Sequence, residues 1–364
     1  KRVVNLMVKE FEMRKAAYRS ARARTSTRGS LDVNKLHSYK YDDHLFKQVA
    51  KLADAKNHGL MMIVDYSGSM HPMMPAVIRQ LLALVMFCKR VGIPYEVYSF
   101  TSGNGAEQYE REVTTFENDR LRMCELFSTR MTKRQYEEAF KMMFWQTKSS
   151  YNTWGWSDYE DMGNTPLNSA LQACSYLVDD FRKKYPVDKM NLVTLTDGDS
   201  NHCYILPGAD IADRWIRPNA WRVEYNRQTV EIAGRGGWSN GRENTAAFVK
   251  ALNEKGVNTV NYYIAGRKSD LNAELKRSLN WDHQKINAAR KEIRNNGVFV
   301  SDDVYGYNRR FVMLGEGAEL NGEVDELEVN GDMTAAKIAK AFSKNSGSKK
   351  KSRIVTQKFA EIVA

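Results

Sequence analysis

The strongest constraint on the fold is a short apolar run, residues 60–64 (LMMIV), that leads directly into the polar sequence DYSGS. A run this short and this apolar is typical of a parallel strand covered by helices on both faces. Asp65, Ser67 and Ser69 follow it at alternate positions. In open α/β sheets, ligands bind beyond the carboxyl ends of the strands. We therefore expect these three side chains to lie at a binding edge.

Two later segments bring similar groups. Residues 163–167 (GNTPL) place Thr165 just before an amphipathic helix, and residues 192–196 (LVTLT) predict a second buried strand that ends at Asp197. Oxygen ligands are those that hard divalent cations accept, and Mg²⁺ keeps several waters besides. The pattern predicts an incomplete oxygen shell with a position open for a partner's carboxylate. The alternative is a polar turn and helix cap, because Asp and Ser favour both.

The three motifs, in this order, resemble the metal-ion-dependent adhesion site of von Willebrand factor A domains. The resemblance implies a doubly wound, mainly parallel α/β sheet of the von Willebrand A or Rossmann-like kind. It also implies a cofactor, Mg²⁺ or Mn²⁺. Its ligands in this sequence would be Asp65, Ser67, Ser69, Thr165 and Asp197.

The flanking sequence is similar to that of the cobaltochelatase subunit CobT, especially the shorter CobT-like proteins of tailed bacteriophages. The likeness covers residues 1–100 and 160–200, including HLF at 44–46 and KNHG at 56–59. It implies a non-catalytic adaptor that works with a MoxR-type AAA+ ATPase ring similar to CobS. The sequence departs from the family pattern at residues 163–165, where GNT replaces the commoner GGT, and it lacks the acidic region of cellular CobT proteins.

The rest of the chain alternates predicted strands and helices. Such βα repeats favour a mainly parallel sheet with helices on both faces. Besides the first strand, we predict strands at residues 94–100, 190–196, 257–265 and 311–314 and helices at residues 75–91, 165–185, 244–255 and 334–343.

Three regions are expected along the chain. Residues 1–58 form a basic helical extension, with a helix predicted over residues 3–28; residues 59–343 form the A-type domain; residues 344–364 form a Lys-rich linker and a C-terminal helix. Two stretches within the domain exceed ordinary loop length, which predicts insertions with structure of their own. They lie at residues 101–160, with helices expected at 121–127 and 133–145, and at residues 201–243, with a hairpin expected at 221–232.

Positive charge gathers near the N-terminus. The chain has a net charge of +11, and residues 1–58 hold fourteen Lys and Arg against six Asp and Glu, a net of +8. A basic extension suits an acidic protein surface or nucleic acid, although a solvated helical face has the same composition. Nucleic-acid binding by this segment is therefore the alternative to the adaptor function.

An enzymatic function has weak support in the sequence. The motifs of zinc proteases, of serine hydrolases and of nucleotide-binding P-loops are all missing. His58 and His71 flank the first metal-site segment and are minor catalytic candidates. Asp199 is either a carboxylate supporting the metal site or a solvated loop residue, with a slight preference for the latter.

The cysteines and the apolar runs bear on the compartment. Cys88 and Cys174 lie on apolar stretches of predicted helices, and the four cysteines show no metal-binding spacing. A membrane span needs about 20 consecutive apolar residues, and no run approaches that length. We therefore expect a cytoplasmic protein with no membrane partner.

Overall fold

The computed structural model describes five main segments of the chain. These are residues 57–102, 121–146, 162–200, 220–233 and 240–315, with the short pieces 24–26, 49–51, 115–117 and 204–206 and residues 5 and 8. The helices predicted at 334–343 and near the C-terminus lie outside the described residues, as do most of residues 1–56.

A seven-stranded sheet forms the centre of the described structure, with the order β12-β13-β11-β7-β3-β4-β6. The five central strands run parallel, whereas β6 and β12 pair antiparallel at the two edges. The strands are β3 (His58–Asp65), β4 (Tyr95–Ser102), β6 (Leu121–Ser128), β7 (Lys189–Thr196), β11 (Val257–Ala265), β12 (Val298–Ser301) and β13 (Arg309–Leu314). The predicted fold class, a doubly wound and mainly parallel α/β sheet, is confirmed.

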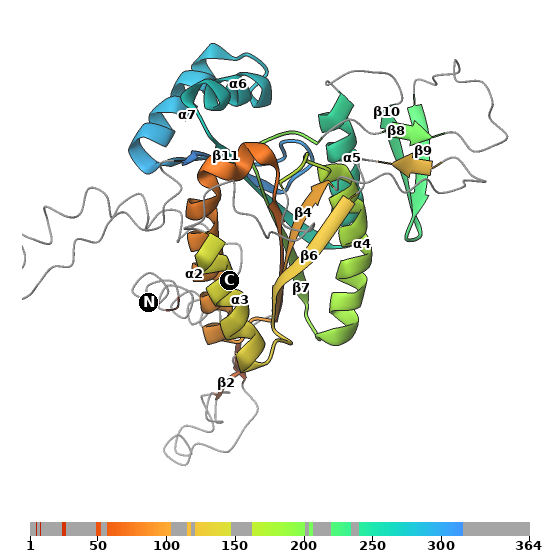
Figure 1. Ribbon diagram of the computed structural model, residues 1–364, viewed down its shortest axis with the longest axis vertical. Helices are drawn as coiled ribbons and strands as arrows, with labels where there is room; N and C mark the ends of the chain where they lie inside the picture. Colours follow the sequence, from red (N-terminus) through yellow and green to blue (C-terminus); the bar gives the residue numbers. More distant parts are fainter. Residues whose placement is uncertain are drawn as a thin grey trace, which may run out of the picture.

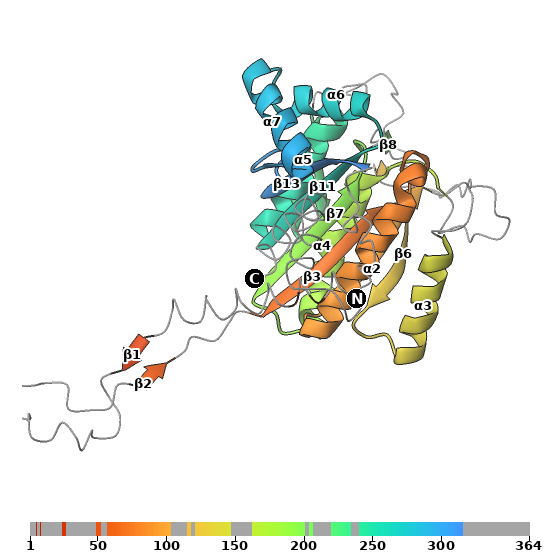
Figure 2. The same cartoon turned by 90° about the vertical axis from the view of Figure 1, so that its left-hand side faces the viewer.

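Helices cover both faces of this sheet (Figures 1 and 2). One face is covered by α2 (Met74–Val91) and α3 (Lys133–Gln146), and the opposite face by α4 (Leu167–Lys184) and α5 (Asn240–Glu254). A helical hairpin, α6 (Lys268–Ser278) and α7 (His283–Asn296), packs beside β11 and β13. The 3-10 helix η2 (Gly68–Met73) leads from β3 into α2. α2 ends at Gly92, whose φ of 77° suits glycine.

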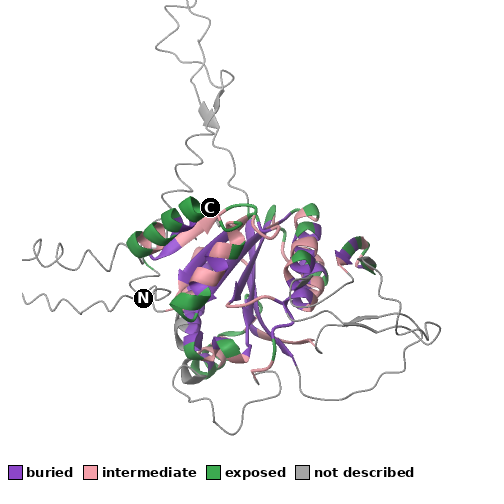
Figure 3. Ribbon diagram, turned by 90° about the horizontal axis from the view of Figure 1, so that it is seen from above, coloured by how far each residue is buried: buried purple, intermediate pink, exposed green. Residues whose placement is uncertain are grey.

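The core is divided between the two faces of the parallel strands. All eight residues of β3 are buried. Leu60, Met62 and Val64 belong to the cluster that includes α2, and Met61 and Ile63 to the cluster that includes α4. Figure 3 shows the buried residues concentrated in the strands and on the inner sides of the helices. A strand covered on both faces has no polar side, which is why residues 60–64 are apolar throughout.

The order of the strands reverses between β3 and β7. From β3 the chain passes through α2 to β4 on one side, and it returns later through α4 to β7 on the other side. At such a switch point the two connections leave in opposite directions, and a crevice opens beyond the carboxyl ends of the two strands. Asp65 ends β3, and Asp197 directly follows β7, so both carboxylates belong to this crevice.

Two helical predictions are wrong. Residues 121–127, predicted as a helix, lie in β6, which pairs with β4 from Ser102 to Glu96. The segment is rich in good helix formers, but pairing along the sheet edge outweighs this weak local preference. The helix predicted over residues 3–28 is also wrong at Arg24–Ser26, which forms β1 and pairs antiparallel with β2 (Val49–Lys51).

The two predicted insertions are described only in part. The hairpin expected at 221–232 is confirmed as β9 (Ala220–Tyr225) and β10 (Gln228–Ala233). The helix expected at 133–145 is confirmed as α3. Short strands β5 (Thr115–Glu117) and β8 (Tyr204–Leu206) pair with each other and so connect the two insertions.

Candidate functional site

The carboxylate that ends β3 is buried and held by two donors. Asp65 Oδ1 accepts a hydrogen bond from the backbone N–H of Ser67 at 2.9 Å, and Oδ2 accepts one from the hydroxyl of Thr196 at 2.7 Å. The first bond closes an Asx turn. The second follows from the parallel register, which pairs Val64 with Leu195 and so brings the next residues, Asp65 and Thr196, together.

Hydroxyl groups connect this carboxylate turn to the loop after β7. The Ser67 and Ser69 Oγ atoms lie 3.1 Å apart, and Ser69 Oγ donates a hydrogen bond to Asp197 Oδ1 at 3.0 Å. Ser67 is buried, Asp197 is half-buried and Ser69 is exposed. Four of the five residues proposed from the sequence as metal ligands therefore meet at the switch point.

The loop that carries Thr165 is joined to the first loop through its backbone. Ser67 and Gly163 form an isolated parallel β-bridge, and the Gly68 N–H donates to the Gly163 carbonyl at 3.0 Å. A Cβ at Gly163 would come within 2.5 Å of the Ser102 carbonyl oxygen, so this close approach requires glycine. Thr165 is buried in the same loop, and no hydrogen bond joins it to the other four residues.

Negative charge is concentrated at this edge. Burial, helped by the charge of the neighbouring Asp197 carboxylate, raises the pKa of Asp65 to about 7. Burial also raises the pKa of Asp197, to which the charge of Asp270 adds. Among the described residues no lysine or arginine forms an ion pair with Asp65 or Asp197. When Asp65 and Asp197 are charged, hydroxyl and backbone donors stabilise them, but no lysine or arginine of the described residues pairs with them.

These groups fit a hard divalent cation. Two carboxylates and adjacent hydroxyls offer oxygen ligands only, which suits Mg²⁺ or Mn²⁺ rather than a metal that prefers sulfur or imidazole. Within the described part of the chain, no group of three or more His, Cys, Asp or Glu side chains is arranged to hold a metal. A cation here would therefore depend on Ser67 and Ser69 as much as on the carboxylates.

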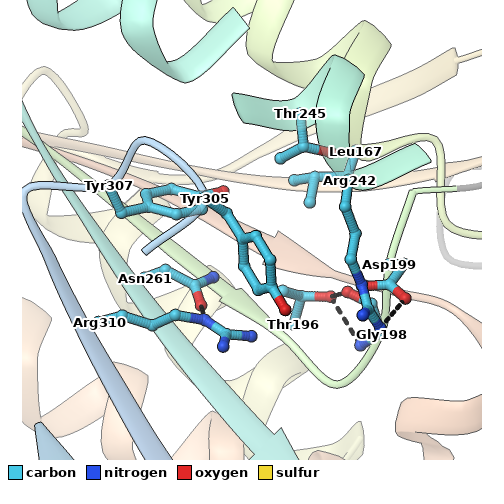
Figure 4. A pocket seen from close by; sticks show the side chains of 10 residues that line it. All are labelled: Leu167, Thr196, Gly198, Asp199, Arg242, Thr245, Asn261, Tyr305, Tyr307 and Arg310. Carbon is cyan, nitrogen blue, oxygen red and sulfur yellow. Dashed lines mark hydrogen bonds and ion pairs between the residues drawn. The ribbon is translucent and has the colours of Figure 1, made fainter. Parts of the chain in front are cut away.

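An ionic network lies behind the loop that follows β7 (Figure 4). The Arg242 guanidinium donates to both oxygens of Asp199, with Nε–Oδ1 at 2.6 Å. Arg310 Nη1 donates to Glu274 Oε1 at 2.6 Å, and Glu274 Oε2 lies 3.6 Å from Arg242 Nη2. The two guanidinium groups lie 5.5 and 4.8 Å from the centre of the Tyr305 ring.

Residues of this network line a small, partly open cavity that reaches the loop after β7. Its volume is about 20 Å³, which is room for a single water. Thr196 and Gly198 line it beside the network residues. The hydroxyl of Thr196 is within hydrogen-bonding distance of both Asp65 and the Gly198 backbone, so the wall of the cavity and the Asp65 turn share one side chain.

Several sequence interpretations of individual residues are now revised. Asp199, in the loop after β7, is half-buried and held by Arg242, so it is more than a solvated loop residue. His58 begins β3 at the amino end of the sheet, about 23 Å from Asp65 at the usual rise per strand residue, so it is not part of this site. The sequence interpretation missed Thr196, although its position next to Asp197 was a usable signal, and it missed Arg242, for which there was no local signal.

Comparisons with known proteins give structural likenesses only. No protein-family model matches the chain, and no curated protein matches its sequence. Among solved structures, the pilus adhesin SpaC from Lactobacillus rhamnosus GG is 13% identical over 58% of this chain, with a TM-score of 0.33. The pilus adhesin RrgA from Streptococcus pneumoniae is 8% identical over 61% of this chain, with a TM-score of 0.33.

A third similar structure is the vWF domain of the type V pili tip protein Mfa5 from Porphyromonas gingivalis, 11% identical over 62% of this chain, with a TM-score of 0.30. The alignment covers 86% of that domain but only 24% of SpaC and 41% of RrgA. The strand order of the central sheet defines the fold class by itself. Within the described residues, no helix has the length and apolar character that crossing a membrane requires.

Proposed function

We propose that this chain is a von Willebrand A-type adaptor that binds Mg²⁺ or Mn²⁺ at the carboxyl edge of its sheet and recognises a partner's carboxylate through the metal. The observation that carries the proposal is the convergence of Asp65, Ser67, Ser69 and Asp197 at the switch point. Two carboxylates share one crevice, and no lysine or arginine of the described residues forms an ion pair with either, which favours the binding of a cation between them.

Each residue of this site would have its own role in binding the cation. Asp65, Ser67 and Ser69 would hold the cation from the first loop, with Asp197 facing them and Thr165 contributing from the bridged loop. The cation supplies a Lewis-acidic site with an exchangeable position, which a carboxylate from another protein can occupy. Thr196 fixes the orientation of Asp65 through its hydroxyl.

The partner we propose is a MoxR-type AAA+ ATPase ring, with a CobS-like ATPase as the model. This part of the proposal is supported by the sequence resemblance to CobT over residues 1–100 and 160–200. The adaptor would present a substrate protein to the ring and would have no catalytic site of its own. Nucleic-acid binding by residues 1–58 remains the alternative prediction, because nearly all of that segment lies outside the described residues.

Calorimetric titration with Mg²⁺ tests the metal site directly. Wild-type protein is expected to bind one equivalent, and Asp65→Asn is expected to bind none while keeping the far-ultraviolet circular dichroism of the wild type. Asn keeps the shape of the side chain and an acceptor for the Ser67 N–H but removes the charge. Asp180→Asn is the matched control, because Asp180 is exposed on α4 and, among the described residues, forms an ion pair with Lys183 alone.

A pull-down of the candidate ATPase in Mg²⁺ and in EDTA tests the partner. Capture that requires Mg²⁺ and is lost in Asp65→Asn supports the metal bridge. Wild-type Mg²⁺ affinity in Asp65→Asn would reject the metal site, whereas a normal metal site without capture would reject only the ATPase partner.

A further inference from the structure

The helical hairpin α6–α7 carries a basic surface that the metal site does not use. Residues 267–297 contain eight Lys and Arg against four Asp and Glu. Seven of the eight cations are exposed, whereas of the four acids Asp270 is exposed, Asp282 and Glu292 are half-buried, and Glu274 is buried against Arg310. The surface of the hairpin is therefore predominantly basic.

An aromatic side chain projects from the turn of this hairpin. Trp281 is 63% exposed, which is the largest exposure among the large hydrophobic residues of the described chain. Lys276 Nζ lies 5.3 Å from the centre of a Trp281 ring. Asn280 and Trp281 both have positive φ, at 49° and 60°, a conformation that is unusual for a residue as bulky as tryptophan.

The hairpin is attached directly to the metal-site loops. Arg277 Nη1 lies 3.9 Å from Asp199 Oδ2, and Glu274 is joined to Asp199 through Arg242. Figures 1 and 2 both show α6 and α7 at the end of the sheet where α2 begins, which is the end that carries Asp65. A ligand bound at the metal crevice thus has the basic hairpin beside it.

We propose that the α6–α7 hairpin is a second docking surface, which selects an acidic protein segment on the partner that offers its carboxylate to the metal. This inference rests on the proposed function, because it requires one partner to contact both the metal and the α6–α7 hairpin. Charge complementarity favours acidic residues flanking the metal-bound carboxylate. Tryptophan is enriched among the anchor residues that dominate protein interfaces, and Trp281 is exposed beside Lys276.

An acidic protein segment fits better than a nucleic acid. Single-stranded nucleic acids need several aromatic platforms along a basic groove, and the described hairpin has one exposed aromatic ring, that of Trp281. An acidic peptide, moreover, already contains the carboxylate side chains that the proposed metal would bind.

Fluorescence anisotropy with labelled peptides tests this inference. The probes are a peptide rich in Asp and Glu with a central Leu, its Asn and Gln counterpart, and single-stranded oligo-dT. The test variant is Lys268→Glu with Lys291→Glu, one exposed cation from each helix of the hairpin. The control is Lys133→Glu with Lys141→Glu, which changes the net charge equally on α3.

We expect the hairpin variant to bind the acidic peptide roughly tenfold more weakly and the α3 control to bind it within about twofold of wild type, with the difference shrinking at high salt. Trp281→Asn is expected to weaken binding roughly fivefold, because asparagine tolerates the left-handed turn but removes the ring.

Three results would overturn the inference: equal losses in the hairpin and α3 variants, no preference for the acidic peptide over its amide counterpart, or tighter binding of oligo-dT. Its failure is separable from that of the metal site. Asp65→Asn removes only the part of the binding that depends on Mg²⁺, and the hairpin variants reduce binding in EDTA as well.

Discussion

Asp65 combines complete burial with two hydrogen-bond donors and a second carboxylate close by. The donors orient the side chain but do not neutralise it. In a protein without bound metal, the charged form is therefore disfavoured, and the pKa is raised to about 7 mainly through burial. A residue in this condition is poised to exchange a proton for a metal ion.

This raised pKa predicts how stability depends on pH. Between about pH 4 and pH 7 the folded protein binds a proton on Asp65 that the unfolded chain has released. The contribution of protonated Asp65 to the free energy of unfolding is fully present below about pH 4 and is lost as the pH rises through 7. In EDTA, the free energy of unfolding is therefore expected to fall as the pH rises from about 4 to 7. Asp65→Asn is expected to remove the part of this fall that comes from Asp65.

Urea unfolding of the two proteins at several pH values measures this difference. Saturating Mg²⁺ is expected to stabilise the wild type at pH 7 more than at pH 5, because protons compete with the metal. Equal slopes for wild type and Asp65→Asn in EDTA would contradict the assignment of the raised pKa to Asp65.

Two glycines of the site allow a matched test of the bridged loop. A Cβ at Gly163 would meet the Ser102 backbone at 2.5 Å, whereas a Cβ at Gly198 would meet nothing within 4 Å. Gly163→Ala is expected to displace the loop that carries Thr165 and to weaken Mg²⁺ binding roughly tenfold, a loss of about 1.4 kcal/mol. Gly198→Ala, although next to Asp197, is expected to keep the wild-type affinity in the same calorimetric titration.

At the scale of elements, a buried ion pair joins the sheet to the helical hairpin. Arg310 of β13 and Glu274 of α6 are 3% and 1% exposed, and their side chains meet at 2.6 Å. Such a pair gains little over apolar packing, but loss of one partner leaves the other charge buried. The attachment of α6 therefore depends on both residues.

Arg310→Met is expected to lower the free energy of unfolding by about 3–5 kcal/mol, because Glu274 loses its main partner. The double variant Arg310→Met with Glu274→Gln is expected to be more stable than Arg310→Met alone, since no uncompensated charge remains. Denaturant unfolding measures both. Additive losses in the double variant would show that the two residues act independently.

At the scale of the whole molecule, the five parallel strands and their helices form the interior. β3 and β7 are buried on both faces, whereas the β9–β10 hairpin alternates buried and exposed residues. The loops that carry Asp65 and Asp197 follow strands that are buried along nearly their whole length, so the candidate site rests on a well-packed part of the described fold.

Hydrogen exchange measured by mass spectrometry is expected to reflect this arrangement. Amides of β3 and β7 should exchange only through global unfolding, and those of β9 and β10 should exchange through local opening. Saturating Mg²⁺ should slow exchange in residues 65–69 and 196–200 more than in α3. If the amides of β9 were as strongly protected from exchange as those of β3, the distinction between the central strands and the β9–β10 hairpin would be contradicted.

The sequence alone determined which segments become core strands and where their polar ends lie. Residues 60–64 are apolar throughout and residues 192–196 contain only Leu, Val and Thr, because both faces of each strand are covered, and that requirement is visible locally. The five parallel strands, α2 and α4 were therefore predictable, as were Asp65, Ser67, Ser69 and Asp197 as residues at strand ends. Two helices, α6 and α7, were missed, because their exposed basic faces leave only a narrow apolar stripe.

Only the tertiary structure decided which strand ends are neighbours. The hydrogen bond from Thr196 to Asp65 spans 131 residues, and the pairs Arg242–Asp199 and Arg310–Glu274 span 43 and 36. That residues 121–127, expected as a helix, form part of β6 likewise depends on pairing with β4. The spacing of apolar residues along the sequence shows which side chains are buried. Which side chains contact one another is set by the order and register of the strands, and these arise only when the whole sheet is assembled.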